Sequence, residues 1–273
     1  MLLGFKTELK LNNQQRTLLA KHCGVARHAW NWGLWLTKNI LDHNQANPND
    51  KLRFPSAIDL HKLLVAMVKP GCPWYYECSK ATPQQALMAL REAWKRCFTK
   101  VSAPPKFKKK GKDDSCTLEG TVKVLSSNKI QVPKIGVLKT YESLPQVPVK
   151  SCTISRKADR WYISYRLEIP EQTSQYTASV GVDLGIKTLA TLSTGEVISS
   201  PRAYKHNEAQ LARLQYLNRH KKPGSNNYRK AQLKVARLHQ RIANIRKDTL
   251  HKLTHYLAKN HGVVVINSMY PGC

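Results

Sequence analysis

Polar and apolar residues alternate at the start of the chain. Between residues 5 and 11, every second side chain is apolar or a threonine, and the side chains between them are polar. A period of two is typical of a strand that buries one face. From residue 13 to about residue 40 a helical pattern follows, and it carries Trp30, Trp32 and Trp35. We expect these tryptophans to pack in a core, with stacking on nucleic-acid bases as the alternative.

Helical patterns continue to about residue 98. A polar stretch with two prolines, residues 44–56, predicts a loop, and a short helix is expected over residues 57–68. Thr82 is predicted to cap the next helix, and Pro83 suits its first position. This part of the chain is therefore predicted to be one strand followed by a helical unit.

A lysine-rich connector, residues 103–116, comes next. Its lysines surround Phe107 between two prolines and a glycine: Lys106, Lys108, Lys109, Lys110 and Lys112. So dense a run with an embedded aromatic favours contact with phosphates, and a solvated linker is the alternative. We expect Asp113 and Asp114 to form local ion pairs rather than a catalytic pair of carboxylates.

Short strands dominate the chain from residue 117 to residue 169. Alternating segments are separated by turns at Asn128 and Asp159, which predicts a small β-barrel or sheet. After a polar linker, a second series of strands is expected at residues 180–184, 188–193 and 196–199.

One acidic residue interrupts this second series. Asp183 lies in an apolar strand pattern, where a carboxylate costs free energy unless it has a partner. Gly181 and Gly185 on either side keep the backbone slim, so a metal ion or a phosphate could approach closely. A lysine partner or a capped turn is the alternative.

Residues 201–262 are strongly basic, with 15 lysines and arginines against 2 acidic residues. The turn at residues 220–227 divides them into a predicted helical hairpin. An apolar stripe on the longer helix leaves four cations for other faces, namely Arg237, Arg241, Lys247 and Lys252. Such one-sided charge favours phosphate binding over a merely solvated coiled-coil-like hairpin.

The whole chain has the same bias. Its 273 residues include 45 lysines and arginines against 17 acidic residues, a net charge of +28, and a polyanion is the partner that best offsets such self-repulsion.

No apolar run reaches the roughly 18 residues that a membrane span needs, and the apolar start is too short for a signal peptide. Neither a nucleotide-binding P-loop, a hydrolase elbow nor a dinucleotide fingerprint is present.

The cysteines and histidines do not predict a metal centre. Seven cysteines without a C-x-x-C pair form neither a disulfide framework nor a zinc ribbon, and they suit a reducing cytoplasm. Cys72 with Cys78, and His251 with His255 at helical i, i+4 spacing, each lack the further ligands that zinc requires. We therefore do not expect zinc in this chain.

The segment GVDLGIKTLATLSTGEVI, residues 181–198, closely resembles the first catalytic motif of a RuvC-like (RNase H-like) nuclease domain. That domain occurs in the TnpB/OrfB family of insertion-sequence transposases, relatives of the type V CRISPR effectors. Other stretches resemble the same family in the expected order: residues 4–34 its N-terminal strand and helix-turn-helix region, then residues 73–98, 104–118 and 234–260.

The resemblance implies an RNA-guided DNA endonuclease. A β-barrel with a helical insertion would hold guide RNA and target DNA, and a RuvC-like domain would cut with Mg²⁺. Asp183 would be the first metal-binding carboxylate. Asn267, however, stands where the family has its catalytic glutamate, and an amide brings no charge to offset the desolvation of the ion. The family's third aspartate and zinc ribbon would lie beyond Cys273.

We therefore expect an α+β fold in three parts. Residues 1–115 would hold the first strand, the helical unit and the connector, residues 116–172 the rest of the barrel, and residues 177–273 a truncated RuvC-like domain. The expected function is binding of DNA and guide RNA with deficient cleavage and an incomplete Mg²⁺ site. Alternatives are a nuclease completed by carboxylates from elsewhere, a nuclease-dead transcriptional regulator and a decayed fragment.

Overall fold

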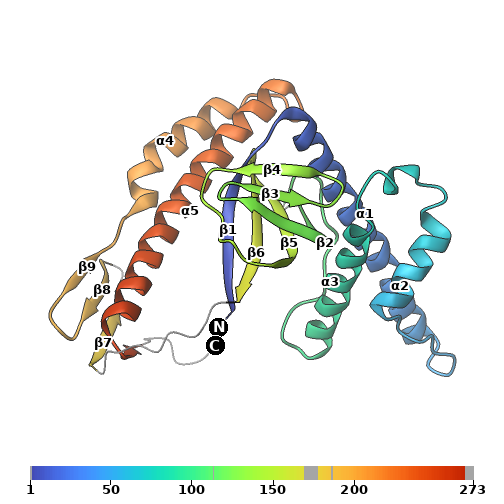
Figure 1. Cartoon of the computed structure of the whole chain (residues 1–273), viewed down its shortest axis with the longest axis horizontal. Coiled ribbons are helices and arrows are strands. Elements are labelled where there is room, and N and C mark those ends of the chain that lie inside the picture. Colours follow the sequence, from blue (N-terminus) through green and yellow to red (C-terminus); the bar gives the residue numbers. More distant parts are fainter. Residues whose placement is uncertain (1, 113, 169–177, 186, 268–273) are drawn as a thin grey trace. The chain divides into compact units, whose positions relative to one another are not determined.

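The computed structural model describes residues 2–112, 114–168, 178–185 and 187–267. The chain divides into two compact units, Met1–Ile169 and Pro170–Cys273. The first unit contains a β-barrel with helices, and the second contains a sheet with a long helical hairpin (Figure 1). The mixed α+β class predicted from the sequence is confirmed.

Six strands of the first unit form a closed barrel in the order β1-β4-β3-β2-β5-β6. Their bounds are β1 Leu2–Lys10, β2 Ser115–Ser126, β3 Lys129–Val132, β4 Gly136–Thr140, β5 Val149–Lys157 and β6 Arg160–Glu168. The first strand pairs antiparallel with β6, Phe5 opposite Tyr165, and with β4, Leu9 opposite Thr140. Thr7 and Leu9 are buried, as the alternation predicted, so the N-terminal strand is one of the strands of the barrel and contributes to its core.

The helical unit is inserted between β1 and β2. It comprises α1 Asn13–Ala46, α2 Ala57–Leu63, the π-helical η1 Leu64–Val68, the 3₁₀-helical η2 Pro73–Tyr75, and α3 Ala81–Phe98. A capping box starts α1, because the Asn12 side chain accepts from the backbone of Gln15 while the Gln15 side chain accepts from the backbone of Asn12. The helix then runs uninterrupted past the predicted end near Ile40.

The start of α3 differs from the prediction. The helix begins at Ala81 with Lys80 at the N-cap position, and the hydroxyl of Thr82 is buried instead of capping. The Thr82 amide donates to the Ser79 carbonyl, so the first turn starts earlier than the sequence signal indicated. Pro83 remains within this turn, where a missing amide costs no helical hydrogen bond.

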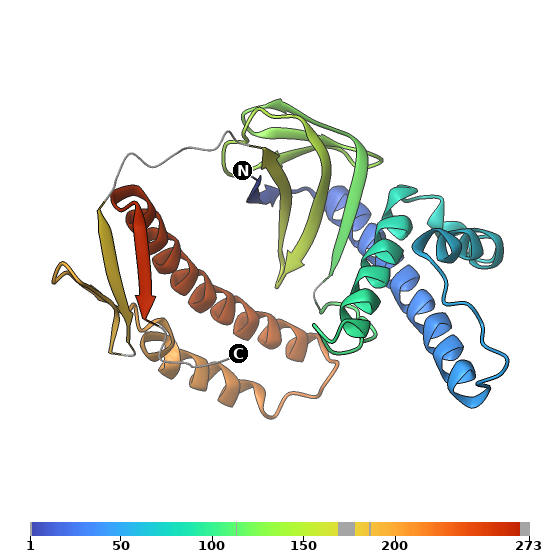
Figure 2. The ribbon, with the colours of Figure 1, turned by 90° about the horizontal axis from the view of Figure 1, so that it is seen from below.

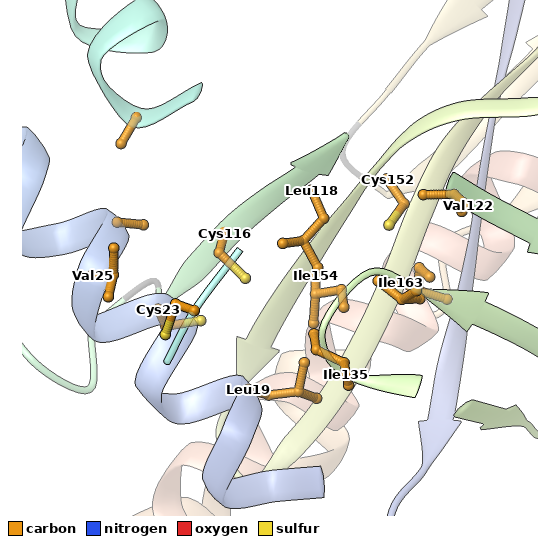
Figure 3. Packing of buried hydrophobic residues seen from close by; sticks show 14 of the residues in the cluster. Leu19, Cys23, Val25, Cys116, Leu118, Val122, Ile135, Cys152, Ile154 and Ile163 are labelled. Atoms are coloured by element: carbon orange, nitrogen blue, oxygen red, sulfur yellow. The ribbon is translucent and has the colours of Figure 1, made fainter. Parts of the chain in front are cut away.

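One core joins the barrel to the insertion. Leu19 and Cys23 of α1 lie beside Cys116 of β2 and Ile154 of β5 (Figure 3). Burial raises the pKa of the Cys152 thiol, in the same core, to about 12. These cysteines therefore act as small apolar core residues at neutral pH.

A close approach of α1 to α3 provides a test of this packing. A Cβ atom on Gly33 would lie 2.7 Å from Leu87 Cδ2 and 2.9 Å from Leu90 Cδ2, and both leucines are fully buried. Gly33→Val is therefore expected to lower the free energy of unfolding by about 1–3 kcal/mol.

Gly24→Val on the same helix is the matched control for Gly33→Val. A Cβ atom there meets only Arg27 Nη2, at 3.9 Å, so valine should change the free energy of unfolding by less than about 0.5 kcal/mol, the difference in helix propensity between glycine and valine. Urea unfolding of both variants measures the difference. Equal responses would contradict the tight contact between α1 and α3.

The second unit has a four-stranded sheet in the order β10-β7-β8-β9. The strands are β7 Ser179–Leu184, β8 Thr188–Leu192, β9 Val197–Ser199 and β10 Val263–Asn267. Pairing is antiparallel except between β7 and β10, which lie parallel side by side (Figure 2). The predicted strands are thus confirmed to within a residue or two.

The predicted helical hairpin is also confirmed, as α4 Ala203–Asn218 and α5 Asn226–Asn260. The C-terminal part of α5 packs Leu253 and Leu257 against Val180 and Val182 of the sheet. Its earlier part forms a separate small core with α4, made by Leu211, Leu238 and Ile242. Within the described ranges, no helix is both long and apolar enough to cross a bilayer.

Candidate metal site and nucleic-acid interface

Asp183 lies near the end of β7, on the face of the sheet opposite its core. Val180 and Val182 point into the core, so the alternation of the strand turns Asp183 the other way, and it is exposed. Its register partners are Asn267 on the parallel strand β10 and Thr191 on β8. Asp183 and Asn267 are 84 residues apart in the sequence, and the structure places them side by side in one sheet.

A hollow of about 520 Å³ lies over this part of the sheet. Gly181, Asp183, Thr191, Ser193 and Asn267 are among its lining residues. The Gly181 amide donates to Ser193 Oγ at 3.0 Å, and a Cβ atom at Gly181 would lie 3.4 Å from Ser193 Cβ. A Cβ atom at position 181 would thus be in ordinary van der Waals contact with Ser193, and the glycine leaves that space empty. Within the described parts of the chain, no lysine or arginine forms an ion pair with Asp183.

The chemistry of these ligands sets what the hollow could hold. Asp183 and Asn267 together offer one carboxylate and one amide oxygen, which suit a hard cation whose other ligands are water or phosphate. A two-ion nuclease centre needs several converging carboxylates. Among the residues that the structure describes, no group of three or more His, Cys, Asp or Glu side chains could hold a metal. The described residues therefore do not fit a two-metal centre.

The lysine-rich connector is held against α1 by its backbone. Trp30 Nε1 donates to the Lys106 carbonyl at 3.0 Å. Asn31 bonds to Lys108 twice, donating to its carbonyl at 3.0 Å and accepting from its amide at 2.8 Å. The ammonium of Lys108 also lies 4.1 Å from the centre of the Trp30 ring. Because these bonds use the backbone, the connector has a defined path along the helix.

The side chains of the connector are presented to solvent. Lys106, Lys109, Lys110 and Lys112 are exposed, and Lys108 is half-buried. Asp114 forms an ion pair at 2.9 Å as predicted, but its partner is Arg27 of α1 and not a lysine of the connector; Asp113 lies outside the described residues. The connector is thus a fixed backbone that carries outward-facing cations.

The helix α5 carries a line of cations. At about 100° per residue, six exposed side chains fall within about 60° of one another around the axis and extend over about 44 Å. We call this set the basic stripe: Lys230, Lys234, Arg237, Arg241, Lys252 and Lys259. Lys252 also pairs with Asp248 at 2.8 Å.

Three of the four α5 cations predicted from the sequence belong to this stripe. Lys247 does not, because it lies about 120° away around the helix. Lys230, Lys234 and Lys259 were missed. Lys230 and Lys234 precede Arg237 by seven and three residues, and Lys259 follows Arg241 by eighteen, and this helical spacing is the signal that would have included them.

Two known family profiles match parts of the chain. A profile described as "Helix-turn-helix domain" matches residues 1–45, and one described as "Probable transposase" matches residues 162–272. Within the first match the structure has β1 and one continuous helix, α1, without an internal turn. The name of that profile therefore does not describe the local conformation here.

Individual relatives extend over most of the chain. The "Putative RNA-guided DNA endonuclease InsQ" of Escherichia coli is 33% identical, over 97% of this chain and 66% of the relative. A putative RNA-guided DNA endonuclease of Mycobacterium tuberculosis is 27% identical, over 97% of this chain and 65% of the relative. The chain thus spans slightly less than two thirds of the length of these curated relatives.

Among solved structures, a Cas12f1–sgRNA–target DNA complex aligns with a TM-score of 0.48 and 10% sequence identity. The alignment covers 98% of this chain and 81% of the other.

Proposed function

Because this chain belongs to the TnpB/OrfB family of insertion-sequence transposases, we propose that it binds guide RNA and DNA without cutting DNA at its Asp183 site. The proposal rests on the strand register that places Asn267 opposite Asp183 in a protein that is otherwise strongly basic. The first part of the proposal concerns binding, and the second concerns the deficient nuclease site.

The placement of the cations supports binding. The connector carries a row of exposed lysines and is held to α1 by hydrogen bonds. The basic stripe is a row of exposed lysines and arginines on the helix α5. Cations in such a row can neutralise phosphates along one strand, and the release of condensed counterions then favours association. Contacts of this kind hold a nucleic acid without reading its bases, as expected for a protein that leaves sequence recognition to a guide.

We further propose that the second unit is a RuvC-like domain. Its antiparallel strands β7, β8 and β9 are joined by a helical hairpin to β10, which returns parallel to β7. This arrangement brings Asp183 and Asn267 together near the C-terminal ends of two adjacent parallel strands. A second carboxylate at position 267 would face the first, so the amide at this place is the residue that accounts for deficient cleavage.

Direct binding tests the first part of the proposal. We expect the purified chain to bind fluorescein-labelled RNA and DNA oligonucleotides with dissociation constants at or below about 10⁻⁶ M in 50 mM salt, since nonspecific binding alone reaches about 10⁻⁶ M even at physiological salt. Fluorescence anisotropy measures both. An absence of binding at low salt would contradict the proposal.

Asn267→Glu tests the second part. The new carboxylate would stand opposite Asp183, and we expect Mn²⁺ affinity, measured by titration calorimetry, to rise about tenfold or more because a second charge offsets desolvation of the ion. Without metal, the two like charges should lower the thermal stability, and added Mn²⁺ should restore it.

The control for Asn267→Glu is the double variant Asp183→Asn with Asn267→Glu. It retains a single carboxylate, so its Mn²⁺ affinity should return to that of the original chain. An unchanged affinity in the Asn267→Glu variant would mean that the two positions do not share an ion.

A further inference from the structure

A second hollow lies on the first unit, along one face of α1. Its volume is about 650 Å³, within the range of about 300–1,000 Å³ typical of ligand sites. The residues from α1 follow helical spacing, and two more come from the segment before α3: Lys21, Gly24, Arg27, His28, Asn31, Trp32, Trp35, Trp74 and Glu77. We call this the tryptophan groove.

Two of the groove tryptophans have exposed rings. Trp35 is 54% exposed and Trp74 is 39% exposed. Trp30 and Trp32 instead pack against the core, as the sequence predicted for the whole set. About half of the Trp35 surface is thus left in water, where it gains no free energy of burial and is open to a stacking partner.

Trp74 is held in place by its neighbours. Its ring lies 4.5 Å from Tyr75 and 5.1 Å from His28, centre to centre, and it meets His28 edge-on. The Tyr75 hydroxyl lies 2.7 Å from His28 Nδ1. Burial lowers the pKa of His28 and raises that of Tyr75, so both groups are neutral at pH 7 and share one hydrogen bond. The groove therefore has a preorganised aromatic wall.

The edges of the groove are charged and fixed. Lys21 pairs with Glu77 across it, and Arg27 pairs with Asp114 of the connector. Asn31, which lines the groove, also holds the backbone of Lys108. The row of exposed connector lysines is thus anchored at the edge of the tryptophan groove through residues that line it.

We propose that the tryptophan groove binds unpaired nucleotides, with bases stacked on Trp35 and Trp74 and phosphates on the connector lysines. This assignment deepens the proposed function and rests on it. Exposed aromatic rings beside a cationic track are the elements with which proteins hold single strands, because every base has a stacking face. A duplex hides those faces between its own base pairs, so it would use the lysines alone.

The test compares a single-stranded oligonucleotide with one of equal length made of abasic sites. The two have the same phosphates and differ in their bases. The chain should bind the base-containing strand more tightly, and Trp35→Leu should weaken that binding about fivefold or more while leaving abasic binding unchanged. Trp35→Phe should restore most of the loss, because it keeps a stacking face.

Tyr141→Leu is the matched control for Trp35→Leu. Tyr141 is 64% exposed on the same unit but does not line the groove, so its loss should leave both affinities unchanged. A second measurement uses the unaltered chain: an oligonucleotide with 5-iodouracil, irradiated in the complex, should crosslink to Trp35 or Trp74.

The outcomes separate the groove assignment from the proposed function. If the unaltered chain binds neither oligonucleotide at low salt, both fail. If it binds in a salt-dependent way but Trp35→Leu keeps the preference for bases, or crosslinks map elsewhere, the groove assignment alone is wrong.

Discussion

Raising the salt concentration from 50 to 200 mM is expected to weaken RNA binding by about 10³-fold or more. The loss follows from counterion release, since about six to ten phosphate contacts give losses of about 10³ to 10⁵ over this range. The connector has four exposed lysines and the basic stripe has six exposed lysines and arginines, which makes ten cations. If about six of these ten cations contact phosphates, the expected loss of affinity is reached.

Fluorescence anisotropy at several salt concentrations measures the slope of log affinity against log salt. We expect a slope of about −5 or steeper for a duplex, from about 0.9 per contact. A shallow slope would mean that few of these cations reach phosphates, and the excess charge of the chain would then need another explanation.

Removing three charges of the basic stripe together is expected to have the second largest effect. Arg237→Gln, Arg241→Gln and Lys252→Gln should weaken RNA binding about a hundredfold at 150 mM salt, since each phosphate contact is worth about fivefold there. The salt slope should become shallower by about 3. The side chains are exposed, so the fold should be retained.

A second triple variant removes the same charge from other faces of the hairpin. Arg213→Gln, Arg229→Gln and Lys247→Gln alter exposed residues that lie outside the basic stripe. We expect a loss of less than about tenfold and a nearly unchanged slope, because only long-range attraction is reduced. Equal losses in the two triples would show that net charge, and not the line of cations, determines affinity.

Local patterns predicted the elements of this fold well. The period-two alternation near Leu9 placed the first strand, and the turns at Asn128 and Asp159 placed two hairpins of the barrel. These patterns are reliable because they report burial of one face of a single element. The same patterns did not predict that the barrel closes, because closure depends on β1 pairing with β4 and β6, which are far along the chain.

The sites were predictable to different degrees. Asp183 was found as a carboxylate in an apolar strand pattern and Asn267 through the family resemblance, whereas their adjacency depends on the register of β10 with β7. The tryptophan groove could not be predicted, because it joins Trp35 to Trp74 from another segment. Helical spacing alone also gave no reason why Trp35 should differ from Trp32, since the difference arises from what packs against each ring.

The most direct test of binding without cleavage is one DNA assay read in two ways. A labelled DNA library of randomised sequence is incubated with the purified chain, the RNA that copurifies with it, and Mg²⁺, and the samples are run on native and denaturing gels. We predict retarded DNA on the native gel and full-length DNA on the denaturing gel. Cleaved DNA that disappears with Asp183→Asn would contradict the account, and so would DNA that is not retarded at low salt.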